Sequence, residues 1–254
     1  MENTEKETIV IVGGAGGIGH ATVRKYAEVG ATVIIGDINE IAAKNLLDKS
    51  GDDVHYFPVD MMRYESIRDF AQKIKEGFGT VTHLINLAGG SLPDETVDNG
   101  IETVDPETIS RSIDLNLKSH LYLVREFLPL IKADSSPNKT ITLISSVNAL
   151  MSFGQPAYSS AKAGMIGLVH SVANELGPYN IRINAVLPGT TPTPKCYEFL
   201  EKSFDALRNA SALKRLSTPE DIAGAIYAVT HFMTSMTGQY IVADAGQTIT
   251  YYYK

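Results

Sequence analysis

The sequence predicts an α/β protein in which a seven-stranded parallel sheet is covered by helices on both faces. Short apolar runs rich in β-branched residues alternate with longer amphipathic segments, an order that is typical of parallel sheets. The runs are nearly continuously apolar, as expected for strands that are buried on both faces. The seven expected strands occupy residues 8–12, 32–35, 54–59, 81–85, 140–144, 181–187 and 239–243.

The segments between these strands are mostly too long to be hairpin loops and are predicted to be helices. The clearest helix start is at Thr218, which can act as a cap and is followed by Pro219 and two acidic residues that suit the positive helix end. Residues 188–215 lack clear periodicity, and such a stretch is usually a functional lid or binding loop, although a surface excursion is the alternative. The expected helices occupy residues 18–29, 39–49, 64–78, 106–131, 157–177 and 219–233.

The composition favours a folded protein without a nucleic acid or membrane partner. The 254 residues are 44% hydrophobic with a formal net charge of −7, and no dense Lys/Arg run offers a surface for phosphate backbones. No apolar run reaches the roughly 18–20 residues that span a bilayer, and the start MENTEKE lacks the regions of a secretory signal. We therefore expect a cytoplasmic protein.

Cysteine and histidine usage bears on two other kinds of site. The single cysteine, Cys196, excludes an internal disulfide and fits a reducing cytoplasm. The six histidines show no metal-ligand spacing, so no metal is expected. Neither repeats nor a low-complexity linker divides the chain, so residues 1–254 are expected to form a single domain with a substrate lid at 190–212.

A glycine-rich loop follows the first expected strand. Gly13, Gly17 and Gly19 stand between that strand and a helical pattern, where backbone N–H groups and the helix N-terminus can receive a pyrophosphate. The second strand ends at Asp37, 18 residues beyond Gly19, where a carboxylate can bind both ribose hydroxyls and repel a 2′-phosphate. Since no Arg or Lys offsets that repulsion, NAD(H) is predicted over NADP(H). The alternative is a ligand-free turn with Asp37 as a helix cap.

Four spaced motifs resemble the classical short-chain dehydrogenase/reductase family. The glycine spacing G-x-x-x-G-x-G is the first, and NLAGG at 86–90 resembles the family's Asn-Asn-Ala-Gly motif. YSSAK at 158–162 resembles its Tyr-x-x-x-Lys, and LPGTTPT at 187–193 its Pro-Gly loop on the nicotinamide side. The resemblance covers nearly the whole chain and implies a Rossmann-type doubly wound fold.

Three residues depart from the family pattern. Val12 replaces the usual Thr before the glycine loop, Leu87 replaces the second Asn of Asn-Asn-Ala-Gly, and Ala245 replaces a common Gly. These changes affect the expected hydrogen bonding of the loop and of the fourth strand. The expected catalytic set is retained.

Tyr158 and Lys162 are four residues apart, so on one helix they share a face. A phenol has a pKa of about 10 in water, and a neighbouring ammonium is expected to lower that pKa so that Tyr158 can exchange a proton with a substrate oxygen. The resemblance implies that Lys162 also holds the nicotinamide ribose. On spacing alone, a solvated helix surface is the more common setting for such a pair.

Two further polar residues complete the expected catalytic set. Ser146, which follows a strand by way of Ser145, could stabilise charge on the substrate oxygen. Either serine could do so, but the family match selects Ser146, one residue nearer the tyrosine than is usual. The resemblance implies that Asn116, in IDLNLKSHLYLV, orients a water beside Lys162; the alternative is a polar residue that bends the helix.

The remaining contacts follow from the motifs. Asp60, after the third strand, is expected at the adenine edge, with a helix cap as its alternative. The expected substrate contacts are Ser146, Asn148, Gln155 and Tyr158. The full set of expected nucleotide contacts is Gly13, Gly17, Ile18, Gly19, Asp37, Asp60, Met61, Asn86, Ala88, Gly89, Tyr158, Lys162, Pro188, Gly189, Thr191 and Thr193.

These residues predict an NAD(H)-dependent oxidoreductase that interconverts a secondary alcohol and a ketone, with Tyr158 as acid and base. Its substrate is expected to be a small molecule. The alternatives are an NAD(H)-binding redox sensor without turnover and a 3-oxoacyl-thioester reductase. The resemblance also implies a homotetramer that pairs the helices at 106–131 and 157–177.

Overall fold

The computed structural model describes residues 6–95, 100–151 and 153–249. Within them, seven strands form one sheet in the order β3-β2-β1-β4-β5-β6-β7, and every neighbouring pair is parallel. This confirms the predicted doubly wound fold, with strand ends shifted by at most two residues. The strands are β1 (Thr8–Val12), β2 (Thr32–Asp37), β3 (Val54–Pro58), β4 (His83–Asn86), β5 (Lys139–Ile144), β6 (Ile181–Pro188) and β7 (Tyr240–Ala243).

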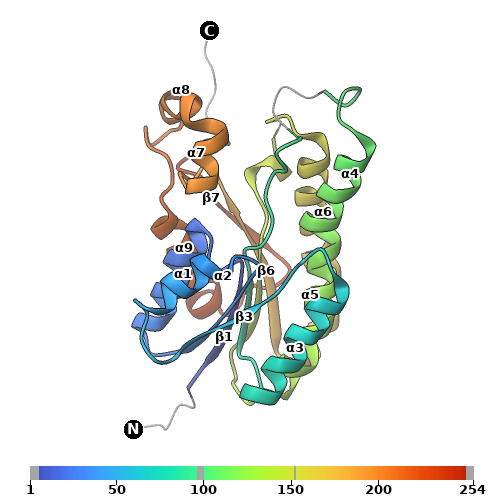
Figure 1. Cartoon of the computed structure of the whole chain (residues 1–254), viewed down its shortest axis with the longest axis vertical. Coiled ribbons are helices and arrows are strands. Elements are labelled where there is room, and N and C mark those ends of the chain that lie inside the picture. Colours follow the sequence, from blue (N-terminus) through green and yellow to red (C-terminus); the bar gives the residue numbers. More distant parts are fainter. Residues whose placement is uncertain (1–5, 96–99, 152, 250–254) are drawn as a thin grey trace.

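Helices cover both faces of the sheet, as Figure 1 shows. α1, α2 and α9 lie on one face, and α3, α5 and α6 lie on the other. The helices are α1 (Gly17–Glu28), α2 (Glu40–Leu47), α3 (Tyr64–Phe78), α4 (Pro106–Ile113), α5 (Ser119–Ala133), α6 (Pro156–Leu176), α7 (Pro194–Leu200), α8 (Phe204–Ala210) and α9 (Pro219–Tyr227).

The apolar strands supply two cores, one on each face. Along β1, Val10 and Val12 pack with residues of α3, α5 and α6, whereas Ile9 and Ile11 pack with residues of α1, α2 and α9. All four side chains are fully buried. Complete burial of such a side chain contributes about 1.5–3 kcal/mol, which explains why the central strands are apolar at successive positions.

Two predicted helices contain a π-helical turn. The helix expected at 106–131 is α4 and α5 joined by η1 (Asp114–Lys118), and α9 continues into η5 (Ala228–Phe232). A π turn accommodates one extra residue in a helix and leaves the apolar periodicity nearly intact, so the sequence pattern does not reveal it. Such turns occur frequently at functional sites.

The segment at 188–215 is more ordered than its sequence suggests, since it contains α7 and α8. Thr193 caps α7 by accepting a hydrogen bond from the Cys196 nitrogen at 3.3 Å. The predicted start of α9 is confirmed as a capping box, in which Thr218 and Asp221 exchange hydrogen bonds of 2.9 and 3.1 Å. Of the helices in the described ranges, none has the length and apolar character needed to cross a membrane.

Candidate active site

The glycines between β1 and α1 occupy positions that no side chain fits. Gly13 has a φ of +78°, and a Cβ there would lie 2.7 Å from the Ala88 nitrogen. A Cβ on Gly19 would overlap the Gly13 carbonyl oxygen. No side chain caps α1 at Gly16, so the first-turn N–H groups keep the capacity to bind an anion. Beside them, Ile18 packs on the core of the α1 face. The loop fits a pyrophosphate.

The loop after β6 meets the glycine loop. Pro188 ends β6, Gly189 packs tightly on the turn after β7, and the buried Thr191 hydroxyl donates to the Gly189 carbonyl at 3.1 Å. A Cβ on Gly17 would lie 2.6 Å from Cγ2 of Thr193. The start of α7 therefore rests on the start of α1, which brings two predicted nucleotide contacts together.

Asp37 connects the end of β2 to the glycine loop. Its Oδ2 accepts a hydrogen bond from the Ala15 nitrogen and its Oδ1 accepts one from the Asn39 nitrogen, both at 2.9 Å. The helix cap of α2 is Asn39, whose Oδ1 accepts from the Ala42 nitrogen at 3.0 Å. The alternative interpretation of Asp37 as a cap is therefore wrong, and its carboxylate lies at the edge where a ribose is expected.

Asp60 closes the turn after β3. Its Oδ1 accepts from the Met62 nitrogen at 2.9 Å, and its own nitrogen donates to the Ser66 hydroxyl at 2.9 Å. The N-cap of α3 is Arg63, so the alternative interpretation of Asp60 as the cap is also wrong. Met61 is buried beneath this turn, in the core that α3 covers.

The turn after β4 depends on Asn86, one of the predicted nucleotide contacts. Asn86 is fully buried, and its Nδ2 lies 2.9 Å from Nδ1 of His120 while its Oδ1 accepts from the Ala88 nitrogen at 3.1 Å. Because its amide is engaged on both sides, the Asn86 side chain shapes the turn. The substituted Leu87 packs into the core on the α1 face.

Asn116 lies in the π-helical turn η1 and holds the next two glycines. Its Oδ1 accepts from the Gly90 nitrogen at 2.8 Å, and its Nδ2 donates to the carbonyls of Gly90 and Ser112 at 3.1 and 3.0 Å. Gly89 has a φ of +127°, and a Cβ there would lie 2.7 Å from the Asn116 Oδ1 and 3.5 Å from the Lys162 Nζ. Asn116 and Lys162 therefore both lie next to Gly89.

Tyr158, Lys162 and Ser146 converge at the carboxyl edge of the sheet. The Lys162 Nζ donates to the Ile144 carbonyl at 2.9 Å and lies 5.6 Å from the centre of the Tyr158 ring. Ser146 follows β5 and lies beside Tyr158, whereas the Ser145 hydroxyl donates to the Lys162 carbonyl at 2.7 Å. Ser146 therefore stands in the predicted place, and Ser145 helps to position α6.

The pKa values of the pair differ from the expected pattern. Burial raises the pKa of Tyr158, and a hydrogen bond with Ser146 opposes that rise. Burial, together with the smaller effect of the nearby charge of Lys195, lowers the pKa of Lys162 to about 7. The expectation that Lys162 lowers the pKa of Tyr158 is not met, because desolvation acts on both groups and weakens the ammonium itself.

This geometry agrees with the comparisons. Residues 13–248 match the family model described as enoyl-(acyl carrier protein) reductase. The 3-oxoacyl-(acyl-carrier-protein) reductase FabG of Chlamydia muridarum is 33% identical over 244 residues, which cover 93% of this chain and 95% of that protein. The chain belongs to the classical short-chain dehydrogenase/reductase family.

Other relatives of this short-chain dehydrogenase/reductase carry different names. The probable galactose dehydrogenase GalD of Rhizobium meliloti is 30% identical, over 94% of this chain and 93% of that protein. A crystal structure of a short-chain oxidoreductase from Burkholderia thailandensis superposes with a TM-score of 0.85 at 29% identity, over 96% of this chain and 94% of that chain. The relatives are therefore oxidoreductases with diverse named substrates.

Glu95 is a site residue that the sequence did not indicate. It is fully buried in this short-chain dehydrogenase/reductase, and its Oε1 accepts from the Tyr158 nitrogen at 2.9 Å, at the start of α6. Its negative charge also contributes to the raised pKa of Tyr158, although less than burial does. No motif surrounds Glu95, which lies in the polar stretch SLPDET.

Two predicted substrate contacts, Gln155 and Asn148, form hydrogen bonds with other residues of the protein. The Gln155 Nε2 donates to the Glu95 carbonyl at 2.9 Å, and its Oε1 accepts from the Ser91 hydroxyl at 3.1 Å. Gln155 therefore ties the 91–95 loop to α6. The Asn148 Oδ1 accepts from Ser146 at 3.2 Å and its Nδ2 lies 3.4 Å from the Ser159 hydroxyl, so Asn148 mainly orients Ser146.

Lys195 is a second residue that sequence reasoning missed. Its Nζ would lie 2.9 Å from a Cβ on Gly90, which places this cation at the catalytic edge near Lys162. It stands two residues after Thr193, in the segment predicted as a lid. That position is the only signal in the sequence that could have indicated it.

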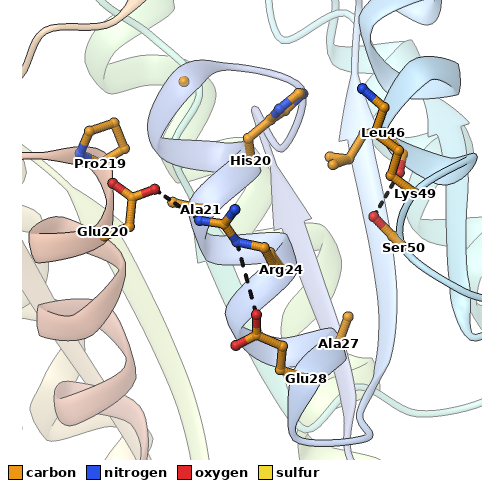
Figure 2. A pocket seen from close by; sticks show the side chains of 11 residues that line it. His20, Ala21, Arg24, Ala27, Glu28, Leu46, Lys49, Ser50, Pro219 and Glu220 are labelled. Carbon is orange, nitrogen blue, oxygen red and sulfur yellow. Dashed lines mark hydrogen bonds and ion pairs between the residues drawn. The ribbon is translucent and has the colours of Figure 1, made fainter.

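A cavity of about 570 Å³ lies on the outer side of α1 and contains none of the catalytic set. Figure 2 shows Arg24 between Glu220 and Glu28, to which its guanidinium lies at 2.9 and 4.0 Å. His20 and Lys49 line its other wall, and burial lowers the pKa of His20. The cavity reaches Gly17, but Tyr158 does not line it, so the catalytic residues lie elsewhere.

Proposed function

We propose that this chain is an oxidoreductase that interconverts a secondary alcohol and a ketone, with NAD(H) as its hydride carrier. The observation that carries the proposal is the convergence of Ser146, Tyr158 and Lys162 beside a glycine loop that leaves space for a pyrophosphate. When bound, the nicotinamide supplies the hydride acceptor or donor. The protein would orient the nucleotide and the substrate and would exchange a proton with the substrate oxygen.

The nucleotide would lie along the carboxyl edge of the sheet. The first turn of α1 would bind the pyrophosphate, and Asp37 would accept hydrogen bonds from the adenosine ribose. Each Asp37 oxygen accepts one backbone N–H and retains a further lone pair for a hydroxyl. Thr191 and Thr193 would contact the nicotinamide half, since α7 rests against α1.

Tyr158 would exchange the proton with the substrate oxygen. Ser146 would donate a hydrogen bond to the same oxygen and so favour negative charge there. Lys162 would hold the ribose, and Asn116, whose Oδ1 retains one lone pair, would orient a water beside Lys162. A phenol with a raised pKa is protonated at neutral pH, which suits the donation of a proton during ketone reduction.

The segment at 190–212 is proposed as the substrate lid. It contains α7 and α8, and its Lys195 lies close to Lys162. A second candidate function is the reduction of a 3-oxoacyl thioester, which the FabG relative and the matching family model favour. The two candidates share the same catalytic residues and differ only in what the lid encloses.

The test is a binding titration followed by a substrate panel. The purified protein is titrated with NADH and NADPH, and nicotinamide absorbance is then followed with sugars, polyols, hydroxysteroids, cyclic ketones and a 3-oxoacyl thioester. Tight NADH binding with turnover of an alcohol or ketone is expected. Binding without turnover on the whole panel would favour the redox sensor, and failure to bind either nucleotide would refute the proposed site.

The nucleotide preference can be tested at Asp37. Asp37→Asn keeps an acceptor for the Ala15 nitrogen but removes the charge that would repel a 2′-phosphate. The ratio of NADPH to NADH affinity should rise by at least about tenfold, while the exposed Asp48→Asn should leave it unchanged. A wild-type protein that already prefers NADPH would contradict the predicted role of Asp37.

A further inference from the structure

A second cluster of polar side chains lies at the opposite edge of the sheet from Tyr158. Glu7 directly precedes β1, His83 begins β4, and His231 lies in the π-helical turn η5 after α9. In the sheet register Ile9 pairs with His83, so the starts of β1 and β4 are neighbours. The fold thereby brings together three residues that are far apart in the sequence, which we call the Glu7 cluster.

The three side chains of the Glu7 cluster point at a common centre. The Nε2 of His83 lies 3.4 Å from Oε1 of Glu7, and the Nε2 of His231 lies 3.1 Å from Oε2. One ligand atom from each of the three residues lies within 4.8 Å of the others. Two imidazoles and one carboxylate form the donor set of zinc sites that keep one coordination position open.

The hydrogen bonds behind the histidines direct a lone pair at that centre. The Nδ1 of His231 lies 2.7 Å from the Thr230 hydroxyl, which has only one proton and also contacts the carbonyls of Ile226 and Tyr227. When Thr230 donates to one of those carbonyls, the tautomer of His231 whose Nδ1–H donates to Thr230 would direct the Nε2 lone pair at a metal ion, whereas the other tautomer donates its Nε2–H to Glu7. Metal-binding histidines are held by this kind of outer contact.

His83 is the member of the Glu7 cluster with an unsatisfied ring nitrogen. It is fully buried, and within the described part of the chain its Nε2 has no hydrogen-bond partner, although a Glu7 oxygen lies 3.4 Å away. Its Nδ1 lies 2.8 Å from the Thr140 hydroxyl. A histidine ring nitrogen without a hydrogen-bond partner can offer its lone pair to a metal ion.

The surrounding charges allow a cation. The His231 Nε2 lies at hydrogen-bond distance, 3.1 Å, from a Glu7 carboxylate oxygen, and a cation would replace that contact as the partner of both atoms. Arg182 opposes a cation, but its guanidinium is engaged by the carbonyls of Val229 and Thr230. The Glu7 side chain is 32% exposed, which leaves a route for an ion and for a water at the fourth position.

We propose that the Glu7 cluster is a binding site for a divalent cation of the zinc class, held by Glu7, His83 and His231. The ion would connect the segment before β1, the start of β4 and the end of α9. This role is structural, because the cluster and the catalytic residues occupy opposite edges of the sheet. The inference does not depend on the proposed function.

The test uses untagged full-length protein that has been freed of metal with a chelator. Calorimetric titration with Zn²⁺ should give one site per chain, and Co²⁺ should produce the absorption of a four-coordinate ion. Glu7→Gln and His231→Ala should each weaken binding by at least tenfold, and Thr140→Val, which loses the contact behind His83, by about 10–100-fold. The exposed His170→Ala is the matched control and should bind as wild type does.

Stability supplies a second readout that does not rest on activity. Zn²⁺ should raise the melting temperature of wild type and of His170→Ala, but not that of Glu7→Gln. Circular dichroism of each variant verifies that it is folded. Absence of Zn²⁺ binding by wild type, or equal binding by Glu7→Gln and His231→Ala, would overturn the proposal, and either result would leave the nucleotide titration unaffected.

Discussion

Tyr158 offers the sharpest test at the scale of a single residue. Tyr158→Phe keeps the ring and removes only the hydroxyl that exchanges a proton, so kcat should fall by about 10²–10⁴-fold while nucleotide affinity stays the same. Steady-state kinetics and NADH titration measure the two quantities. Tyr179→Phe removes the hydroxyl of a 47% exposed tyrosine and should have wild-type activity. Activity retained by Tyr158→Phe would exclude the proposed mechanism.

Lys162 makes the stability of the fold depend on pH. The unfolded chain holds the Lys162 proton up to a pKa of 10.5, whereas the folded chain releases it near pH 7. Between these values the unfolded state binds more protons, so the contribution of Lys162 to the free energy of unfolding rises with pH, by up to about 1.4 kcal/mol per unit. Below pH 7 its burial is destabilising.

Denaturant unfolding of wild type and Lys162→Met between pH 6 and 9 measures this effect. The free energy of unfolding of wild type minus that of Lys162→Met should increase with pH from about 7 upward. Lys73→Met removes the same charge from an exposed position of α3 and corrects for the change in net charge. A wild-type minus Lys162→Met difference that stays constant or falls with pH would contradict the burial argument.

At the scale of an element, the glycine loop can be distinguished from an ordinary helix glycine. Gly13→Ala forces a Cβ into a backbone with φ of +78° and into the Ala88 nitrogen, so it should destabilise the protein by about 1–3 kcal/mol and weaken NADH binding. Gly77 lies in α3, and a Cβ added there would meet no atom within 4 Å. Gly77→Ala should therefore raise the free energy of unfolding by about 0.5–1 kcal/mol. Denaturant melts compare the two, and equal effects would refute the steric role of Gly13.

The elements also show why sequence reasoning succeeds for some features and fails for others. The strands were predictable because burial on both faces requires continuous apolar residues. η1 and η5 were not, because one extra residue hardly alters the apolar period. α7 and α8 have seven residues each, too few to display an amphipathic repeat.

Some residues of the candidate site could likewise be predicted from the sequence, and others could not. The glycine, tyrosine and lysine positions could be predicted because local spacing in the sequence marks them. Glu95 and Lys195 reach the site only through tertiary packing of loops, and no local pattern marks them. The Glu7 cluster is a further case, since residues 7, 83 and 231 have no ligand spacing and meet only because β1 and β4 are adjacent.

At the scale of the whole molecule, one outer face suits contact between copies of the chain. α5 exposes Leu121, which is 45% accessible, and α6 exposes Ala163 and Gly167, with open space around the latter. Small residues let helices approach closely, and an exposed leucine beside them adds apolar area to bury. We therefore expect a homotetramer in which α5 and α6 pair between subunits, and light scattering should give the mass of four chains.

Two substitutions separate loss of assembly from loss of folding. Leu121→Glu places a charge in the proposed contact and should yield smaller species. Gly167→Leu adds bulk to the same face but favours the isolated helix by about 1 kcal/mol, so a dissociated variant should retain its circular dichroism. Ile41→Glu, at a 77% exposed position of α2 on the other face, should remain tetrameric. A wild-type monomer, or tetramers of both Leu121→Glu and Gly167→Leu, would show that α5 and α6 do not form the contact.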